Sequence, residues 1–235
     1  MLLAAGRGER MRPLTDHTPK PLLIVGDKPL IAWHIENLAR AGICDLVINH
    51  AHLGSQIEAA LGNGSQFGVS IRYSPENPAL ETAGGIANAL PLLGDEPFAV
   101  INSDIYCDYN FAQLPIHAAA LAKRGDIAHL VLVNNPVHHP QGDFLLQAGR
   151  IITSERLTTN VSKLTFSGIG IYQHELFAHI ARGSSTPLAP LLRTQIALGK
   201  VSGEHHNGCW MDVGTPQRLE ELDNILRTTH NDCHA

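Results

Sequence analysis

Short apolar runs, typical of buried strands, alternate along this chain with stretches in which apolar residues recur at helical spacing. In the first third, the patterns predict strands at residues 2–5, 46–49 and 69–73 and helices at 29–41 and 53–61. Strands and helices that alternate in this way form the βαβ units of a parallel sheet. We therefore expect the N-terminal part of the chain to form an α/β fold with a parallel sheet.

The same alternation continues toward the C-terminus. Residues 127–134 are almost wholly apolar, which predicts a strand in the centre of the sheet. Other strands are expected at 98–104 and 164–172. Helices are expected at 80–90, 110–124 (with Pro115 disturbing its first turns), 174–180, 188–198 and from Pro216 onward. The predicted fold class is α/β, a Rossmann-like mixed, mostly parallel sheet with flanking helices, in a single domain at residues 1–228 followed by a frayed tail at 229–235.

Composition narrows the functional classes. The chain has 235 residues, of which 44% are hydrophobic, and this is enough to bury a substantial core. A formal net charge of −5 argues against non-specific binding of nucleic acid or anionic membranes. No run approaches the roughly 20 apolar residues of a membrane span, and the N-terminus does not resemble a signal peptide. Four scattered cysteines without a CxxC pair favour reduced thiols, so we expect a cytoplasmic protein.

Glycines and cations gather directly after the first predicted strand. Gly6 and Gly8 permit a tight turn whose successive N–H groups could bind an anion. Arg7, Arg12 and Lys20 add three cations within a short segment, for which a polyphosphate is the natural counter-charge. The spacing excludes both the Walker pattern and the dinucleotide fingerprint. A tight turn with solvated arginines remains the alternative interpretation.

Carboxylates follow two later segments at places suited to a metal ion. The apolar strand that begins at Phe98 ends in Asn102, Ser103 and Asp104, at the edge of a sheet where α/β folds bind ligands. Mg²⁺ prefers oxygen ligands and often takes one or two protein carboxylates, so Asp104 is the first candidate ligand. Asp212 precedes a turn in which Thr215 can cap the last helix, and it could be a second ligand. Asp108 is expected to be a solvated carboxylate or a cap.

Other glycines and acids could face a ligand. The glycine-containing turn before the helix at 80–90 could present free N–H groups, although helix capping would select the same residues. In the loop after residue 134, Gly142 could let the backbone approach a ligand, and Asp143 could accept a bond from a ligand hydroxyl or simply be exposed. Gly168, inside a predicted strand, marks another place where a ligand could approach the backbone.

The segment LAAGRGERMRPLT, followed by PKPL, resembles the signature of the sugar-1-phosphate nucleotidyltransferases. The resemblance covers almost the whole chain and implies the nucleotide-diphospho-sugar transferase type of fold, with Mg²⁺ as cofactor. It implies that Arg12 meets the β and γ phosphates, that Lys20 steadies the reacting phosphates, and that Asp104 and Asp212 chelate the same ion. It also implies that the true start of the chain lies upstream of Met1. The implied nucleotide-binding residues are Leu3, Ala4, Ala5, Gly6, Gly8, Arg12, Lys20, Glu81, Thr82, Gly84 and Asn102.

The resemblance is less complete for the residues that would bind the sugar phosphate. Gly142 and Gly168 match sugar-facing glycines of the family, and Asp143 lies beside the first of them. Many members have Glu-Lys-Pro where this chain has Glu155 and Arg156. The resemblance implies that Glu155 contacts sugar hydroxyls and that Arg156 binds the sugar phosphate, since arginine can hold phosphate through two bonds. Lys163 could take this second role instead.

The resemblance implies the reaction. An oxygen of a sugar-1-phosphate would attack the α-phosphorus of a nucleoside triphosphate and release pyrophosphate. INHAHLGSQI, SPENPALETAGGI and WMDVGTP are most similar to the bacterial N-acetylmuramate α-1-phosphate uridylyltransferases of peptidoglycan recycling, which implies UTP and that sugar phosphate as substrates. Guanylyl transfer to mannose-1-phosphate and thymidylyl transfer to glucose-1-phosphate stay open, as do a non-catalytic nucleotide-sugar sensor and an unrelated nucleotide-binding scaffold. No oligomeric state is indicated.

Fourteen histidines raise the question of a zinc site. Several are close in sequence, such as His138 with His139 and His205 with His206. Neither HExxH nor the Cys/His spacing of a zinc finger is present, so the sequence disfavours zinc.

Overall fold

The computed structural model describes residues 1–156 and 161–232. The chain forms two compact units, which we treat separately. The N-terminal unit comprises Leu2–Ala79, Asn102–Asp108 and the chain from Cys209 onward. The central unit comprises Met1, Leu80–Ile101 and Tyr109–Gly208.

The N-terminal unit contains a parallel sheet. Strand β4 (Asp45–His50) lies between β1 (Leu2–Ala4) and β5 (Ser70–Pro75) and is parallel to both. The connecting segments contain helices α1 (Leu30–Arg40) and α2 (Gly54–Leu61), as expected for βαβ units. The apolar stripe predicted on α1 is buried, including Ile31, Ile35 and Leu38. Short 3-10 helices lie at Glu9–Met11, Leu14–Asp16, Lys20–Leu22 and Ser65–Phe67.

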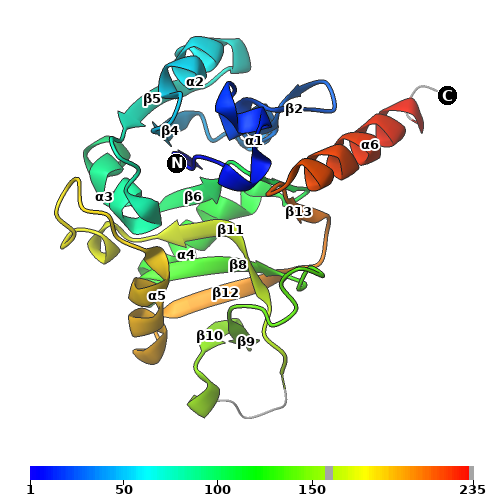
Figure 1. The fold of residues 1–235 in the computed structure, drawn as a ribbon. Coiled ribbons are helices and arrows are strands. Elements are labelled where there is room, and N and C mark those ends of the chain that lie inside the picture. The colour runs from blue at the N-terminus through cyan, green and yellow to red at the C-terminus, as the bar shows by residue number, and fades with distance from the viewer. Residues whose placement is uncertain (157–160, 233–235) are drawn as a thin grey trace. The chain divides into compact units, whose positions relative to one another are not determined.

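Two C-terminal elements of this unit pack against segments from earlier in the chain. Strand β13 (Trp210–Asp212) pairs antiparallel with β7 (Ile105–Cys107), and helix α6 (Pro216–Asp232) follows it (Figure 1). A hairpin of β2 (Ile24–Val25) and β3 (Lys28–Pro29) contacts α6. One apolar cluster unites these segments, and its buried members are Met11, Leu23, Val25, Leu30, Val213, Leu222 and Leu226.

The central unit has a mixed sheet in the strand order β6-β11-β8-β12-β10-β9. Its strands are β6 (Phe98–Asn102), β8 (Ala128–Val133), β9 (Leu145–Gln147), β10 (Arg150–Ile152), β11 (Thr165–Tyr172) and β12 (Val201–His206). Of the pairings between these described strands, only that of β8 with β12 is parallel, and the two run side by side in Figure 1. Every residue of β8 is buried, which confirms its predicted central place. The unit's helices are α3 (Glu81–Leu93), α4 (Leu114–Arg124) and α5 (Leu188–Ala197), with 3-10 helices at Phe111–Gln113, Ser154–Arg156 and His174–Leu176.

The predicted α/β class with a mixed sheet and flanking helices is confirmed, but several local predictions are wrong. The helix expected at residues 174–180 is only the 3-10 turn His174–Leu176, because so short a segment forms few hydrogen bonds to offset helix nucleation. Pro115 does not disturb α4 but lies in its first turn, where no backbone donor is needed. Helix α6 extends to Asp232, and residues 233–235 lie outside the described part, so the frayed tail at 229–235 stays a prediction.

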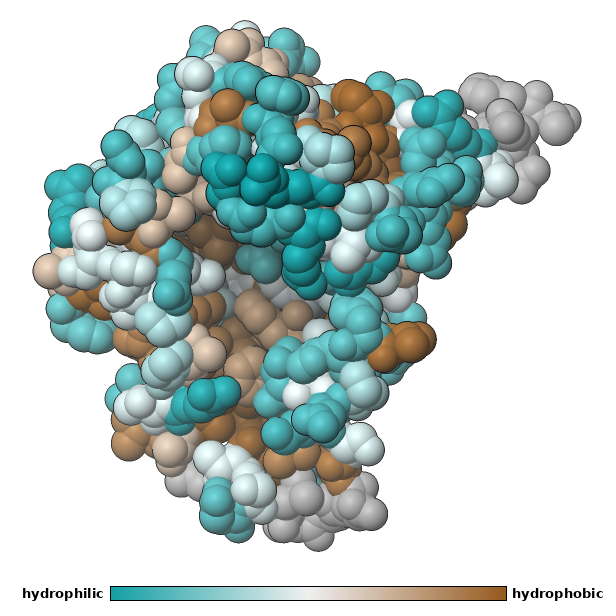
Figure 2. Space-filling view, in the orientation of Figure 1, coloured by the Kyte–Doolittle hydropathy of each residue, from teal (hydrophilic) through white to brown (hydrophobic). Residues whose placement is uncertain are grey.

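The surface carries both hydrophilic and exposed apolar residues. Hydrophilic residues cover much of the face shown in Figure 2, with hydrophobic residues visible between them. Among the described residues, no helix is both long and apolar enough to span a membrane. Large hydrophobic side chains with the greatest exposure lie in different elements: Leu14, Ile24, Ile116, Val137, Leu198 and Ile225.

Candidate active site

Asp104 and Asp212 lie at neighbouring positions in the N-terminal unit. Asp212 is the last residue of β13 and lies opposite Ile105, the first residue of β7. The N–H of Val213 donates to the carbonyl oxygen of Asp104 over 2.8 Å, so the ladder continues past both aspartates. The strand pairing therefore brings together two carboxylates that are far apart in the sequence.

Each aspartate has a cationic partner. Lys20 Nζ lies 2.6 Å from Asp104 Oδ2, and Arg218 Nη1 lies 2.5 Å from Asp212 Oδ1. The side chain of Lys20 is only 9% exposed, whereas that of Asp104 is 42% exposed. The carboxylate is thus open to a ligand from solvent while its lysine partner is held inside. Two aspartates supply the oxygen donors that Mg²⁺ prefers, so this donor set fits that ion.

The glycine loop encloses the stem of Lys20. Gly8 has φ +69°, and an added Cβ would lie 3.1 Å from Thr15 Cγ2 and 3.3 Å from Lys20 Cβ. The Thr15 hydroxyl donates to the Gly8 carbonyl over 2.9 Å and closes the turn. Gly8 is thus required for packing inside the loop. An added Cβ at Gly6, in contrast, would meet no heavy atom within 4 Å, so Gly6 is the position with room for a ligand.

Two of the three arginines in the loop, Arg7 and Arg12, pair with acids nearby. Arg12 Nε lies 2.7 Å from Asp16 Oδ1, and Arg7 Nε lies 2.6 Å from Glu9 Oε1. The side chains of Arg7 and Arg12 are 46% and 54% exposed. Exposed pairs of this kind contribute about 1 kcal/mol or less, so a phosphate could displace the carboxylates at small cost.

Buried bonds fix the backbone that carries Asp104. His34 Nε2 lies 2.7 Å from the carbonyl oxygen of Ile105, and because that oxygen accepts, the ring nitrogen must donate. Burial lowers the pKa of His34 to about 4, although the bond to Ile105 and the charge of Asp104 oppose the shift, so the ring is neutral near pH 7. Ser103 donates to the Leu3 carbonyl through both its N–H and its hydroxyl, at 3.1 and 2.6 Å.

Sequence patterns did not single out Arg218, Arg10 or His34. Arg218 lies in the first turn of α6, where Thr215 Oγ1 accepts from the Arg218 N–H at 3.4 Å and acts as the predicted cap. An added Cβ at Gly214 would lie 2.5 Å from Arg218 Nη2 and 3.1 Å from Arg10 Nη2, so both guanidinium groups adjoin this turn. The only available signal for Arg218 was its position just after the cap.

Some of the remaining candidate nucleotide-binding residues form hydrogen bonds within the protein. The N–H of Ala4 donates to Asn49 Oδ1 over 2.9 Å, and the Leu3 carbonyl accepts from Ser103. Ala5 follows β1 and Asn102 ends β6, and both are half-buried. Their nucleotide contacts stay predictions.

At the start of α3 in the central unit, the N–H groups of Ala83 and Gly84 both donate to the carbonyl oxygen of Thr186 at 3.0 Å, so these two groups are used by the fold. That other N–H groups of this turn face a ligand stays a prediction. A Cβ on Gly84 would collide with the Ser184 carbonyl, which shows that this glycine permits close packing. Glu81 has φ +59°, a left-handed conformation that is uncommon outside glycine. The proposed base contacts of Glu81, Thr82 and Gly84 stay predictions.

The loop around Gly142 is held by its own contacts. Gly142 has φ +60°, and an added Cβ would lie 2.6 Å from Asn135 Oδ1, so the tight approach there is made by the chain. Asp143 Oδ2 accepts from the Phe166 N–H at 2.8 Å, and its Oδ1 lies 3.0 Å from His139 Nε2. Asp143 therefore anchors the loop to β11. A sugar hydroxyl at Asp143 would have to share these oxygens.

The other sugar candidates lie on β11 and in the segment before it. Gly168 has φ +85° and occupies an irregularity where the pairing register of β11 shifts, which accounts for a glycine without a ligand. Glu155 is exposed, and its pKa is lowered by hydrogen bonds from Thr153, its own backbone and Ser154. The side chain of Arg156 lies outside the described part of the structure. The sugar-phosphate roles of these residues stay predictions.

Comparisons with known proteins identify relatives of this chain. The Nucleotidyl transferase family matches residues 1–229. The chain is 55% identical to the N-acetylmuramate alpha-1-phosphate uridylyltransferase of Neisseria meningitidis, over 94% of this chain and 95% of that protein. It is 36% identical to the protein of the same name from Caulobacter vibrioides, over 92% of each chain.

A solved structure supports the fold. A Bacillus anthracis protein assigned as a glucose-1-phosphate thymidylyltransferase, solved in complex with sucrose, superposes with a TM-score of 0.82. The match covers 96% of this chain and 94% of that one at 24% identity, a level at which it bears on the fold alone. Together with the family match over nearly the whole sequence, these findings show that the chain belongs to the nucleotidyl transferase family.

Proposed function

We propose that this protein transfers a uridylyl group from UTP to N-acetylmuramate α-1-phosphate, forming a UDP-sugar for peptidoglycan recycling. The observation that carries the reaction is the pairing of β7 with β13, which places Asp104 beside Asp212 while Lys20 contacts Asp104. The choice of substrates rests on the 55% identity to a uridylyltransferase over nearly the full length of both chains.

The chemistry requires no nucleophilic side chain. An anionic oxygen of the sugar phosphate attacks the α-phosphorus of UTP and forms the new P–O bond. The bond from the α-phosphorus to the oxygen bridging to the β-phosphorus breaks, and pyrophosphate leaves with the electron pair. The protein must align the two anions and neutralise their charge.

The residues of the N-terminal unit suit these tasks. Asp104 and Asp212 would hold Mg²⁺, which would supply positive charge to the phosphate oxygens. Lys20, whose stem is enclosed by the loop, would direct its ammonium group to the reacting phosphates. Arg12 would exchange its exposed partner Asp16 for the β and γ phosphates. Arg218 would hold the carboxylate of Asp212 in place.

Pyrophosphate release tests this proposal. The purified chain is incubated with Mg²⁺ and each of UTP, GTP, dTTP and ATP against N-acetylmuramate α-1-phosphate, mannose-1-phosphate and glucose-1-phosphate. We expect the highest kcat/KM for UTP with N-acetylmuramate α-1-phosphate. Preference for GTP with mannose-1-phosphate, or dTTP with glucose-1-phosphate, would replace the substrates but keep the reaction. Nucleotide-sugar binding without pyrophosphate release would contradict the reaction itself and favour a sensor.

A further inference from the structure

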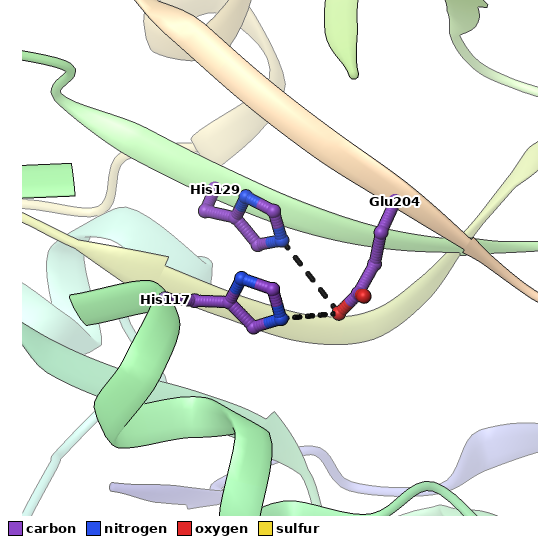
Figure 3. A group of neighbouring side chains, drawn as sticks. All are labelled: His117, His129 and Glu204. Carbon is purple, nitrogen blue, oxygen red and sulfur yellow. Dashed lines mark ion pairs between the residues drawn. The ribbon is translucent and has the colours of Figure 1, made fainter. Parts of the chain in front are cut away.

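Two histidines and a glutamate, none of which has a role in the proposed reaction, converge in the central unit. His117 comes from α4, His129 from β8 and Glu204 from β12, and Figure 3 shows both rings directed toward the carboxylate. Glu204 Oε1 lies 3.1 Å from His117 Nε2 and 3.6 Å from His129 Nε2. The three potential ligand atoms all lie within 4.8 Å of one another.

These separations suit a small tetrahedral ion. Zinc binds imidazole nitrogen and carboxylate oxygen at about 2.0–2.2 Å, and two ligands on a tetrahedral centre then lie about 3.4 Å apart. The two measured nitrogen–oxygen separations, 3.1 and 3.6 Å, fall on either side of this value. The separation of Glu204 Oε1 from each ring nitrogen therefore suits one shared ion.

His129 supports a ligand here independently of the distances. Its side chain is 8% exposed, and its Nε2 is buried without a hydrogen-bond partner. On the other side of the ring, Nδ1 lies 3.0 Å from Ser202 Oγ, while that hydroxyl is directed at the Ala128 carbonyl at 3.5 Å. Nδ1 therefore has a partner within the sheet, whereas the buried Nε2 faces the carboxylate without a hydrogen bond to it, and an ion bound between the two atoms would satisfy both.

A neighbouring hydroxyl orients the carboxylate. The Tyr109 hydroxyl donates to Glu204 Oε1 over 2.5 Å, as partners of metal ligands do. The rings are stacked at 4.2 Å with planes 12° apart, so both must turn for their lone pairs to meet at one ion. The side chains of His117 and Glu204 are 20% and 32% exposed, so the cluster lies near the surface.

We propose that His117, His129 and Glu204 form a binding site for a divalent transition metal of the zinc class. Its ligands are two imidazole nitrogens, one carboxylate oxygen and a water. The ion would cross-link α4 to two strands of the sheet and stabilise the central unit. Mixed nitrogen and oxygen donors distinguish this site from the carboxylates of Asp104 and Asp212, which suit magnesium.

Metal titration of the full-length protein tests the proposal. The protein is stripped with a chelator and titrated with Zn²⁺ against a competing chromophoric chelator, in nucleotide-free buffer containing excess Mg²⁺ to occupy oxygen-only sites. We expect one tight Zn²⁺ per chain. Co²⁺ in its place should give the intense visible absorption of a tetrahedral centre. Wild-type protein that binds no Zn²⁺ tightly would overturn the proposal.

Variants assign the binding to these residues. Glu204→Gln keeps the shape of the side chain, and His117→Gln alters the more exposed histidine, so both should fold. Each should weaken Zn²⁺ binding at least about tenfold, since even the outer partners of metal ligands contribute that much. The matched control is His205→Gln, because His205 is the exposed neighbour of Glu204 on β12. Equal Zn²⁺ binding by all variants would place the ion at other histidines and overturn the assignment.

Discussion

The acidic site of the N-terminal unit and the histidine cluster of the central unit show two ways in which a fold assembles ligands. Asp104 and Asp212 lie where β7 begins and β13 ends, with Lys20 and Arg218 as counter-charges. The side chains of the histidine cluster come from within a helix and two strands, and they place two imidazole rings beside one carboxylate.

This difference in position explains a difference in predictability. Polar residues that interrupt an apolar strand stand out in the sequence, as Asp104 does after residues 98–102. His129, in contrast, occupies an ordinary position within a buried strand, and its partners are on other elements. The comparison predicts that the two regions respond separately to mutation, pH and metal.

The largest expected effect on kcat comes from replacing either of the two carboxylates, Asp104 and Asp212. Asp104→Asn and Asp212→Asn should each lower kcat about 100-fold or more, taking the loss of one preorganised charge contact as a guide. The measurement is Mg²⁺-dependent pyrophosphate release with saturating UTP, on variants whose thermal unfolding shows that they fold.

Asp108→Asn is the matched control, because Asp108 follows β7 directly and its N–H pairs with Cys209. It should change kcat by less than about twofold, since surface substitutions outside a site have small effects. Near-normal activity of Asp104→Asn would refute the metal assignment.

Acid should destabilise the N-terminal unit through His34. Its pKa is about 4 in the folded protein, against an ordinary value of 6.5 in the unfolded chain, so the unfolded chain takes up the proton first as the pH falls. Stability is then complete above pH 6.5 and declines toward pH 4, by about 3 kcal/mol at 1.36 kcal/mol per pKa unit.

Urea unfolding between pH 4 and 7 measures this slope. His34→Gln should have a flatter pH dependence than the wild type, whereas His205→Gln, which changes an exposed histidine, should keep the wild-type slope. An unchanged slope in His34→Gln would transfer the acid sensitivity to other groups, such as His117 of the cluster.

Lys20 should have the next largest effect. Lys20→Met removes the cation that contacts Asp104 at 2.6 Å but keeps an apolar stem for the loop. A hydrogen bond to a charged group is worth about 1.5–3 kcal/mol, so kcat/KM for UTP should fall roughly 10- to 100-fold. Lys20→Arg should recover part of this loss because it restores the charge. Equal activity in Lys20→Met and wild type would remove Lys20 from the reaction.

Replacing one glycine in each unit by alanine should change stability least among these variants, and it compares the two units directly. Gly8 and Gly149 have nearly equal φ, +69° and +74°, but a Cβ would lie 3.1 Å from Thr15 Cγ2 at Gly8 and no closer than 4.0 Å to its neighbours at Gly149. Both alanine variants should lose about 1 kcal/mol of stability through left-handed strain. Only Gly8→Ala should also raise the KM for UTP, because it displaces Lys20. A raised KM in Gly149→Ala would show that strain alone is responsible.

Local patterns predicted many of the elements because burial imposes a period on the chain. The stripe of Ile31, Ile35 and Leu38 and the apolar run of β8 each indicated an element that the structure confirms. Strand β12 was missed, since Val201–His206 contains Ser202, Gly203 and Glu204 in place of an apolar run. Its partner β8 supplies the hydrogen bonds that make it a strand, and no local signal records that pairing.

The sequence by itself determined the α/β class, the glycine loop with Lys20, and the two aspartates as candidates, because turns, cations and acids next to apolar runs are local features. The tertiary structure alone decided which side chains meet. It paired Asp104 with Lys20 and placed Asp212 at the neighbouring position. It also bonded two N–H groups near the start of α3 to the Thr186 carbonyl, and it brought His117 close to His129 and Glu204. These contacts depend on strand register and helix docking, which arise from burial summed over the whole chain and not from any single segment.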